Sequence, residues 1–538
     1  MQQQQKQIID NLEKLQSCDL SSQINLEIQL EHKQLGNRGA SNLGNCLEKC
    51  TNLSALSLHL LSNQIQDNGF SNLGSAFTKL YNLTTLGLYL SFNQIGPQGA
   101  SEFASSLEKC TNLQKFRLGL NKNQIGVYGA SQIGYALEKL KKLSNLILYF
   151  QYSEIGAQGA KNLCSSLANS TNLSIIELDF QSNKIGLQGS LNLCSALQKC
   201  TKLSTLKLYL NENLFGRVSA QSLGSALGKF DHLLSLTLEV MWNDIGDESA
   251  LQLVSGIVKC PKLLSLSLEL LNQKINELGA LDIGNCLQKC INLSTLVLFL
   301  SDNQIGDKGI SDLGSTFTKL SNLTILKLWL PVNLIGVQGA SDFASSLAKC
   351  ANLSTFKIGL NFNQVGAQGA TQIGLALAKL TKLQNSSLYF SQNRISAQGL
   401  SDLGSALAKC INLSTLKLEL SDNKIGVLGA TNLCSALQKC TSLSTLKLCF
   451  NLISFGSDSA QSLGFTLAKF DHLLSLTLKV MWNGIVDQSA SDLVSCLVKC
   501  TNLLCLTLSL DYNNIKSPLE LKAKVLKMKR LVNHRVSY

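Results

Sequence analysis

The stretch Ile291 to Leu320, INLSTLVLFLSDNQIGDKGISDLGSTFTKL, recurs along the chain at intervals of thirty residues. A leucine stands at every position equivalent to Leu293 from Leu53 to Leu503, and no insertion or deletion interrupts the sixteen consecutive copies. A fixed period of about 20–50 residues is typical of a solenoid, in which each repeat contacts mainly its neighbours. The sequence therefore predicts one continuous repeat structure instead of the several globular domains that 538 residues would otherwise indicate.

The first half of each copy has the pattern of a half-buried strand. Leu56, Leu58 and Leu60 alternate with more polar residues, which is the period-2 mark of a strand with one face in the core. An asparagine follows at position 63 in thirteen of the sixteen copies. Its side chain can bond to neighbouring backbone groups that a tight coil would otherwise bury unpaired.

The second half of each copy has the pattern of a helix. Leu73, Phe77 and Leu80 lie at i, i+4 and i+7, which gives one buried stripe. Two further columns of this helix hold mainly glycine, alanine, serine and cysteine, as at Gly74 and Ala76. Because glycine inside a helix costs about 1 kcal/mol, we interpret these small residues as a means of close helix packing.

The motif LxLxxNxIGxxGA, followed by a helix, resembles the ribonuclease-inhibitor class of leucine-rich repeats over residues 23–515. The resemblance implies an α/β solenoid of about 16–17 repeats of thirty residues, shaped as a horseshoe with a concave parallel β-sheet and convex helices. In this family the repeat is usually shorter by one or two residues, so we expect a deeper concave sheet here.

A longer period underlies the short one. DHLLSLTLEVMWNDIG at 231–246 returns as DHLLSLTLKVMWNGIV at 471–486, which is 240 residues later. Residues 43–282 and 283–522 therefore read as a tandem duplication of an eight-repeat block. Differences between the copies are informative, since Glu177 corresponds to Lys417 and Glu239 corresponds to Lys479.

The two ends of the chain depart from the repeat. Residues 1–22 are predicted to form an N-terminal capping helix, with a targeting or partner-binding helix as the alternative, because the end of a solenoid exposes a cross-section of its core. Residues 516–538 carry seven lysines and arginines against one glutamate and are predicted to form a basic C-terminal capping helix. Binding to an acidic partner or a membrane surface is the alternative for this segment.

The cysteines and the N-terminus predict a cytoplasmic protein. Nine of the eighteen cysteines occupy one column, in which other copies place leucine or phenylalanine, so they read as small core residues. The N-terminus lacks the apolar segment of a secretory signal, and no run of eighteen apolar residues exists that could span a membrane.

No catalytic, cofactor or metal motif stands out, and the sequence predicts a protein that is not an enzyme. Pairs such as Cys46 and Cys50 have a spacing that a metal could use on a helix. Both of these columns also accept apolar or small residues, which favours packing, so no metal and no cofactor is predicted.

A column of lysines, from Lys49 to Lys499, fills fifteen of the sixteen copies near the predicted helix C-termini. A cation at this place complements the helix dipole, which accounts for the column in structural terms. The functional alternative is a ridge that binds phosphates, but no aromatic residues are interleaved with it. Nucleic acid is therefore an unfavoured partner.

The strand positions between the buried leucines are the better candidate for a binding site, because neighbouring parallel strands lie about 4.8 Å apart and place these residues on one surface. In the first block they form an acidic and aromatic set: Glu177, Asp179, Tyr209, Glu212, Glu239, Trp242 and Glu269. Exposed aromatic residues are a mark of interfaces, although their high strand propensity is an alternative explanation.

The sequence thus predicts a non-enzymatic scaffold that binds a protein with a basic surface on its concave face and acts as an inhibitor or regulator. The resemblance leaves a GTPase-activating protein as the alternative function. A nucleic-acid or membrane-surface binder, acting through the lysine column and the basic tail, is the third.

Overall fold

The computed structural model describes residues 7–170, 172–243, 245–455, 460–526, 528 and 530–537. The contacts divide the chain into two compact units, unit 1 (Met1–Gln273) and unit 2 (Lys274–Tyr538). In each unit strands and helices alternate, and β2 to β18 begin at intervals of thirty residues.

Unit 1 contains β1 (Gln7–Ile9), α1 (Leu12–Ser17), β2 (Asn25–Gln29), α2 (Gly36–Leu47), β3 (Ala55–His59), α3 (Asp67–Ala76), the 3₁₀ helix η1 (Phe77–Lys79), β4 (Thr85–Tyr89), α4 (Pro97–Leu107), β5 (Lys115–Gly119), α5 (Gly126–Lys139), β6 (Asn145–Tyr149), α6 (Gly156–Ala168), β7 (Ile175–Asp179), α7 (Gly186–Leu197), β8 (Thr205–Tyr209), α8 (Gly216–Leu227), β9 (Ser235–Glu239), α9 (Gly246–Ile257) and β10 (Ser265–Glu269).

Unit 2 contains α10 (Glu277–Leu287), β11 (Thr295–Phe299), α11 (Gly306–Phe317), β12 (Ile325–Trp329), α12 (Val337–Leu347), β13 (Thr355–Gly359), α13 (Gly366–Ala378), β14 (Asn385–Tyr389), α14 (Ala397–Leu407), β15 (Thr415–Glu419), α15 (Gly426–Leu437), β16 (Thr445–Cys449), α16 (Ala460–Leu467), β17 (Ser475–Lys479), α17 (Asp487–Leu497), β18 (Cys505–Ser509), α18 (Pro518–Val525) and β19 (Asn533–Ser537).

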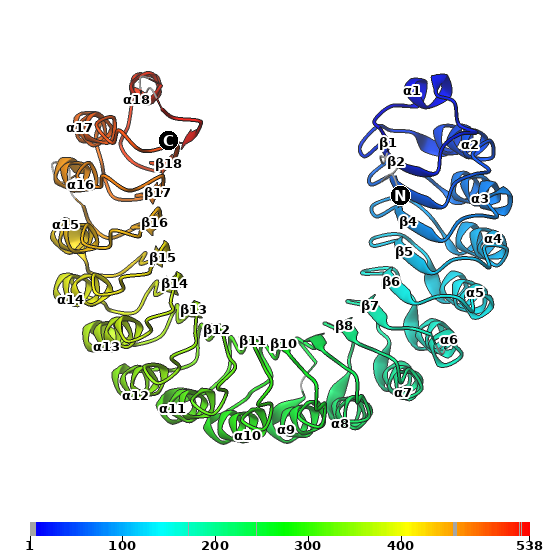
Figure 1. The fold of residues 1–538 in the computed structure, drawn as a ribbon, viewed down its shortest axis with the longest axis horizontal. Coiled ribbons are helices and arrows are strands. Elements are labelled where there is room, and N and C mark those ends of the chain that lie inside the picture. Colours follow the sequence, from blue (N-terminus) through cyan, green and yellow to red (C-terminus); the bar gives the residue numbers. More distant parts are fainter. Residues whose placement is uncertain are drawn as a thin grey trace. The chain divides into compact units, whose positions relative to one another are not determined.

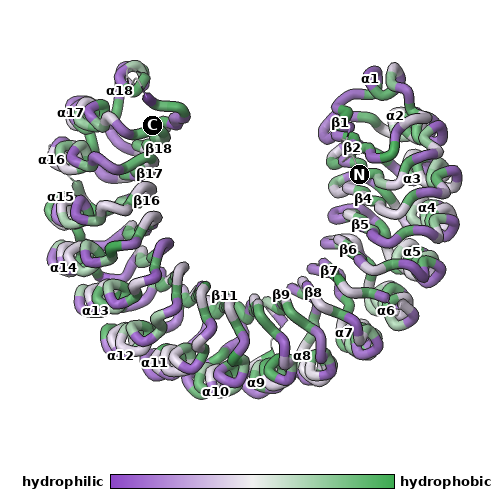
Figure 2. The backbone as a smooth tube through the Cα atoms, viewed as in Figure 1, coloured by the Kyte–Doolittle hydropathy of each residue, from purple (hydrophilic) through white to green (hydrophobic). Residues whose placement is uncertain are grey.

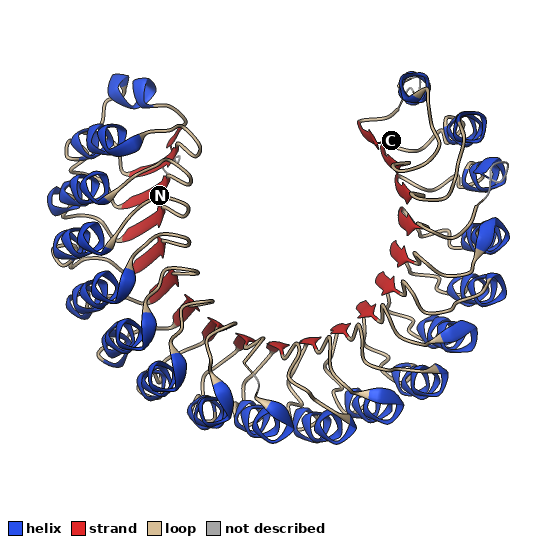
Figure 3. Ribbon diagram, turned by 180° about the vertical axis from the view of Figure 1, so that it is seen from behind, coloured by secondary structure: helices blue, strands red, loops and turns tan. Residues whose placement is uncertain are grey.

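Each unit, taken by itself, is an open arc with parallel strands on its inner side and helices on its outer side (Figures 1 and 3). Successive strands pair in register with residues thirty positions apart, as Leu206 does with Leu236 in unit 1 and Leu326 with Leu296 in unit 2. The predicted α/β solenoid with a concave parallel sheet and convex helices is confirmed within each unit.

The core of each coil lies between the strand and the helix. Leu206 and Leu208 of β8 are completely buried, and so are Leu223 and Leu227 on the facing side of α8. Because these apolar positions alternate with polar ones along the chain, green and purple segments succeed one another along every coil (Figure 2). The predicted strand and helix patterns are therefore both confirmed at this level.

In most coils the turn after the strand holds a buried asparagine that bonds to the coil before it. Asn213 is completely buried. Its Nδ2 donates to the carbonyl oxygen of Phe180 at 2.7 Å, and its Oδ1 accepts from the backbone N–H groups of Asn183 and Ile185 at 3.1 and 3.3 Å. The same pattern recurs at Asn333 in unit 2. Each such side chain thus satisfies backbone groups that no other part of the coil could reach.

The small residues of the helices permit very close contact between neighbouring coils. A Cβ added at Gly256 of α9 would lie 1.9 Å from the carbonyl oxygen of Gly224 in α8. No real Cβ tolerates such a distance, so the glycine is required for this approach. The interpretation of the small columns as a packing device is confirmed at this position.

Both ends of the chain add a strand as well as a helix. In the N-terminal segment, for which the sequence predicted a helix, β1 pairs with β2, and α1 is only six residues long. In the C-terminal segment β19 pairs with β18 after the short helix α18. The outermost strand of a sheet presents unpaired N–H and C=O groups, which these terminal strands engage. The glutamine run, Lys527, Lys529 and Tyr538 lie outside the described residues.

The cysteines are free thiols, and sixteen of the eighteen are buried. In the predicted core column burial raises the pKa of Cys110 and of Cys350 to about 11. These thiols pack as apolar side chains, as predicted. Among the described residues, no helix combines the length and the apolar composition needed to cross a membrane.

Replacement of the buried asparagine should destabilise unit 1. In Asn213→Ala the carbonyl of Phe180 and two N–H groups lose their partner, and each unsatisfied buried group costs about 1–3 kcal/mol. We expect the free energy of unfolding from urea titration to fall by about 2–4 kcal/mol. The exposed Asn52, which also donates to a carbonyl of the preceding coil, is the control, and Asn52→Ala should change it by less than about 0.5 kcal/mol. Equal effects of the two variants would contradict the assignment.

Replacement of the closely packed glycine should also destabilise unit 1, against the trend of helix propensity. Propensity alone would favour Gly256→Ala by about 1 kcal/mol. The contact with Gly224 should reverse this sign and lower the free energy of unfolding by about 1–3 kcal/mol. Ser225→Ala, at an exposed position of α8, serves as the control and should be nearly neutral. A stabilised Gly256→Ala variant would show that the helices can separate freely.

Candidate functional site

The strand face of unit 1 carries two rows of side chains that point away from the helices, because they alternate with the buried leucines. On β7 and β8 the middle row pairs Glu177 with Lys207, and the last row pairs Asp179 with Tyr209. Tyr209 in turn pairs with Glu239 of β9, which pairs with Glu269 of β10. Five of the seven predicted residues therefore lie side by side on four neighbouring strands.

Glu177 is the most buried of the predicted residues and is already paired. Only 8% of its surface is exposed. One carboxylate oxygen lies 3.0 Å from Lys207 Nζ, and the other accepts a hydrogen bond of 2.7 Å from the Tyr149 hydroxyl. The charge of Glu177 is thus balanced within the chain, and its role is to hold Lys207 and Tyr149 in position below the surface.

The remaining three strand carboxylates form what we call the acid cluster, which consists of Asp179, Glu239 and Glu269. Among the described residues none of the three has a cation within 4 Å. Burial, followed by repulsion from Glu239, raises the pKa of Glu269 to about 7. Burial also raises the pKa of Asp179 to about 6, opposed by a hydrogen bond from the Gln181 N–H and reinforced by the neighbouring carboxylates. The cluster holds negative charge that its surroundings do not compensate.

One amide side chain, Asn211, and one aromatic side chain, Tyr209, lie beside the carboxylates of the acid cluster. Asn211 donates from Nδ2 to the carboxylate of Glu239 at 3.1 Å, which opposes the rise of the Glu239 pKa caused by burial. Tyr209 lies between Asp179 and Glu239 in the row, and burial together with these carboxylates raises its pKa to about 12. Its hydroxyl therefore stays protonated and available as a donor at neutral pH.

The last two predicted residues lie on the turns that leave the strands. Glu212 follows β8, is exposed, and accepts a hydrogen bond of 2.7 Å from Ser182 Oγ. Trp242 follows β9, and 54% of its surface is exposed. Both residues have left-handed backbone, with φ of 55° and 57°. The left-handed backbone recurs at this turn position in all sixteen copies, so the exposed indole, and not the backbone, marks this rim as a candidate contact.

The counterparts of these residues in unit 2 differ in chemistry but not in backbone. Trp482, 240 residues after Trp242, has φ of 59° and is 53% exposed. Cys449, at the position equivalent to Tyr209, is 3% exposed, and Lys479 replaces Glu239. The acid cluster therefore belongs to unit 1 alone.

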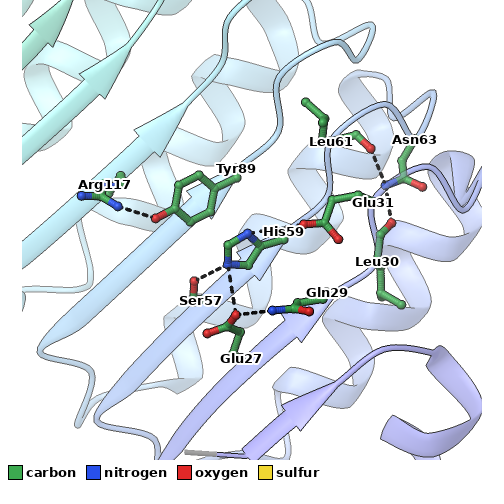
Figure 4. A network of polar contacts seen from close by, with 10 residues as sticks. All are labelled: Glu27, Gln29, Leu30, Glu31, Ser57, His59, Leu61, Asn63, Tyr89 and Arg117. Carbon is green, nitrogen blue, oxygen red and sulfur yellow. Dashed lines mark hydrogen bonds and ion pairs between the residues drawn. The ribbon is translucent and has the colours of Figure 1, made fainter. Parts of the chain in front are cut away.

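Sequence reasoning missed a polar network on β2 to β5 of unit 1 (Figure 4). His59 stacks on Tyr89 with ring centroids 4.4 Å apart, and its Nε2 lies 3.6 Å from a Glu27 oxygen. The Tyr89 hydroxyl accepts a hydrogen bond of 2.6 Å from Arg117. Beside it a hollow of about 220 Å³ lies over Gly87. The absence of a side chain at Gly87, in a row that otherwise carries side chains, was the only sequence signal.

The lysine column lies on the helix side, near the helix C-termini, where Lys349, Lys379 and Lys409 are exposed. Its structural explanation by the helix dipole agrees with this location. Within the part of the chain that the structure describes, no group of three or more histidine, cysteine, aspartate or glutamate side chains is arranged to hold a metal ion.

A comparison with protein families identifies the repeat. The family model described as Leucine Rich repeat matches residues 83–104, 232–254, 292–314 and 412–434. Each match covers a strand, the turn after it and part of the following helix. A search of curated proteins finds no match to this chain. Together with the fold, the four matches show that the chain has a leucine-rich-repeat fold.

The acid cluster should make stability depend on pH. The pKa of Glu269 is about 7 in the folded chain against an ordinary 4.5. Between these pH values the folded chain therefore keeps a proton on Glu269 that the unfolded chain has lost. This carboxyl therefore lowers stability progressively as the pH rises from about 4.5 to 7. Glu269→Gln should match the wild type near pH 4 and unfold about 1–2 °C higher at pH 8, measured by circular dichroism.

The exposed Glu248 on α9 provides the control for this experiment. Glu248 lies in the first turn of α9, where a negative charge is favourable to the helix dipole, so Glu248→Gln should not raise the unfolding temperature at pH 8. If Glu269→Gln behaves in the same way, the carboxyl of Glu269 is not held in its protonated form.

Proposed function

We propose that this leucine-rich-repeat protein is a non-enzymatic scaffold that binds a basic segment of another protein on the strand face of unit 1. The binding site would consist of the seven residues predicted from the sequence, six in contact with the partner and Glu177 in a supporting role: Glu177, Asp179, Tyr209, Glu212, Glu239, Trp242 and Glu269. By occupying a basic surface of its partner, the protein would act as an inhibitor or regulator.

The observation that supports this proposal is the uncompensated acid cluster. Asp179, Glu239 and Glu269 share one half-buried surface, where burial and, to a smaller extent, repulsion among the carboxylates raise the pKa values of Asp179 and Glu269. A lysine or arginine side chain of a partner would remove this repulsion and would lower both pKa values on binding. Arginine is the better match, because its planar group can bond to a carboxylate through two N–H groups.

The residues around the cluster have distinct roles in this proposal. Trp242 offers a large exposed apolar surface beside the carboxylates, as expected of an interface anchor. Glu212 extends the negative surface to the same rim. Glu177, paired with Lys207, acts indirectly by fixing the position of Tyr149 and of the strand surface below the partner.

The full helix after each repeat strand supports assignment to the ribonuclease-inhibitor class of leucine-rich repeats, from which the thirty-residue length departs by one or two residues. Neither the family match nor the geometry favours the GTPase-activating alternative. The cytoplasmic location and the capping roles of residues 1–22 and 516–538 stay predictions, as does the duplication of 43–282 as 283–522.

Binding can be tested with a labelled ten-residue peptide of alternating arginine and glycine as the probe. Glu239→Gln combined with Glu269→Gln should weaken binding at pH 8 by about tenfold or more, because two carboxylates close to the peptide are lost. Fluorescence anisotropy measures the affinity. The wild-type affinity should also rise between pH 5.5 and 8, and calorimetry in two buffers should detect proton release, since Asp179 and Glu269 ionise on binding.

Two matched controls separate the acid cluster from general charge. Glu102→Gln combined with Glu248→Gln removes the same charge from exposed positions on the helices, and should change the affinity by less than about twofold. Against a natural partner recovered by affinity purification, Trp242→Ala should reduce capture, whereas Trp482→Ala should not. The proposal fails if the helix variants weaken peptide binding as much as the cluster variants do.

A further inference from the structure

The strand face of unit 2 carries a row of lysines that the sequence analysis did not use. We call Lys327, Lys357, Lys417 and Lys447 the lysine row. They occupy the middle positions of β12, β13, β15 and β16, and Ser387 of β14 completes the register between them. With strands about 4.8 Å apart, the row spans about 19 Å of the face.

The charges of the lysine row are not balanced by the protein. None of the four lysines forms an ion pair with a carboxylate of the described residues. Glu419 is the only carboxylate on β12 to β16, all of which the structure describes, and it accepts a hydrogen bond of 2.6 Å from Ser421. Burial, followed by repulsion from the other three lysines, lowers the pKa of Lys357. A ligand with several negative charges would relieve this repulsion.

Beside the lysine row lies a set of aromatic rings, which we call the ring platform: Phe299, Trp329 and Tyr389. The rings of Phe299 and Trp329 are 5.9 Å apart and within 4° of parallel, and those of Trp329 and Tyr389 are 4.7 Å apart. A Cβ at Gly359, the residue between Trp329 and Tyr389, would lie 2.5 Å from Trp329 Cε3. Glycine at this place lets the indole lie over the neighbouring strand.

The lysine row and the ring platform are in contact. Lys417 Nζ lies 4.5 Å from the centre of the Tyr389 ring. A single surface therefore carries cations on four of five neighbouring strands and, immediately beside them, half-buried aromatic rings. Surfaces that bind single-stranded nucleic acid combine these two features, because phosphates follow the cations while bases stack on the rings.

We propose that the strand face of unit 2 binds single-stranded nucleic acid, with phosphates along the lysine row and bases on the ring platform. In a duplex the faces of the bases are covered by stacking on the neighbouring base pairs, so the rings select for a single strand. Residues 274–538 contain 25 lysines and arginines against 15 aspartates and glutamates, a net charge of +10 of which segment 516–538 supplies +6, whereas residues 1–273 contain 22 against 20, a net charge of +2. This excess steers a polyanion toward unit 2.

The first experiment measures binding of a labelled twelve-nucleotide oligo(dT) to the full chain by fluorescence anisotropy. The fourfold variant Lys327→Gln, Lys357→Gln, Lys417→Gln and Lys447→Gln should bind about tenfold or more weakly. For this variant the slope of log K against log salt concentration should be shallower by about 2–3, because each lost contact with a single-strand phosphate removes about 0.7 from the slope. Arginine at the same four positions should preserve binding.

A matched variant removes four lysines of the same repeats from the helix side, Lys349→Gln, Lys379→Gln, Lys409→Gln and Lys439→Gln. All four are exposed near helix C-termini, and their loss should change the affinity by less than about threefold. The ring platform is tested separately. Trp329→Leu should weaken binding about tenfold and leave the salt dependence unchanged, because stacking does not release counterions.

Binding at the ring platform can be measured directly by tryptophan fluorescence, because the chain has three tryptophans and two of them can be replaced. In a background of Trp242→Phe and Trp482→Phe, Trp329 is the sole tryptophan, and its fluorescence should be quenched on titration with oligo(dT). Each variant is compared with the wild type by circular dichroism, so that a loss of binding is assigned only to a folded chain.

Four outcomes would overturn the proposal. The first would be a lysine-row variant that binds as tightly as the wild type, and the second a helix-side variant that loses as much affinity as the lysine-row variant. A twelve-residue glutamate peptide displaces the oligonucleotide at equal concentration, which would assign the face to an acidic protein segment. A duplex of the same length binds as tightly, which would leave the rings without a role.

Discussion

The hydrogen bonds from each buried asparagine to the coil before it are the constraint on which the rest of the structure depends. A parallel strand that turns sharply into a helix leaves backbone groups inside the turn, where neither water nor a regular ladder can satisfy them. Asn213 bonds to three such groups of the preceding coil, at Phe180, Asn183 and Ile185. Within each unit these bonds tie a coil to the one before it, and the coils follow one another at intervals of thirty residues.

The fixed spacing turns positions in the sequence into rows on a surface. Because the repeat strands of each unit pair in register with residues thirty positions away, a side chain of the strand face lies beside its equivalent in the next coil. The charge of each surface is therefore set by equivalent positions on neighbouring strands. Asp179, Glu239 and Glu269 form one surface in unit 1, and the lysine row forms another in unit 2. The backbone is the same in both places, and only the side chains between the buried leucines differ.

The sequence predicted the fold almost completely, since a strict period leaves few alternatives. It was less informative about binding surfaces: one residue was assigned a wrong role, and one set of rings was missed. Glu177 belonged to the predicted acidic surface, but Lys207 at the adjacent strand position balances its charge, and only a comparison of neighbouring rows reveals this. The ring platform escaped notice because it depends on Gly359, whose missing side chain determines where the indole of Trp329 lies. Terminal strands were also missed, because their pairing depends on the exposed edge of the sheet and not on a local pattern.

The burial of the cysteines has a consequence for the lifetime of the molecule. With the pKa of Cys110 and Cys350 near 11, the thiolate that reacts with oxidants is scarce at neutral pH while the coils are closed. When a coil opens, its thiol meets solvent together with those of neighbouring coils, and a mixed disulfide formed at that moment cannot be accommodated in the repacked core. Reversible opening in reducing surroundings thereby becomes permanent in oxidising ones, and the redox state of the medium determines whether this chain can refold.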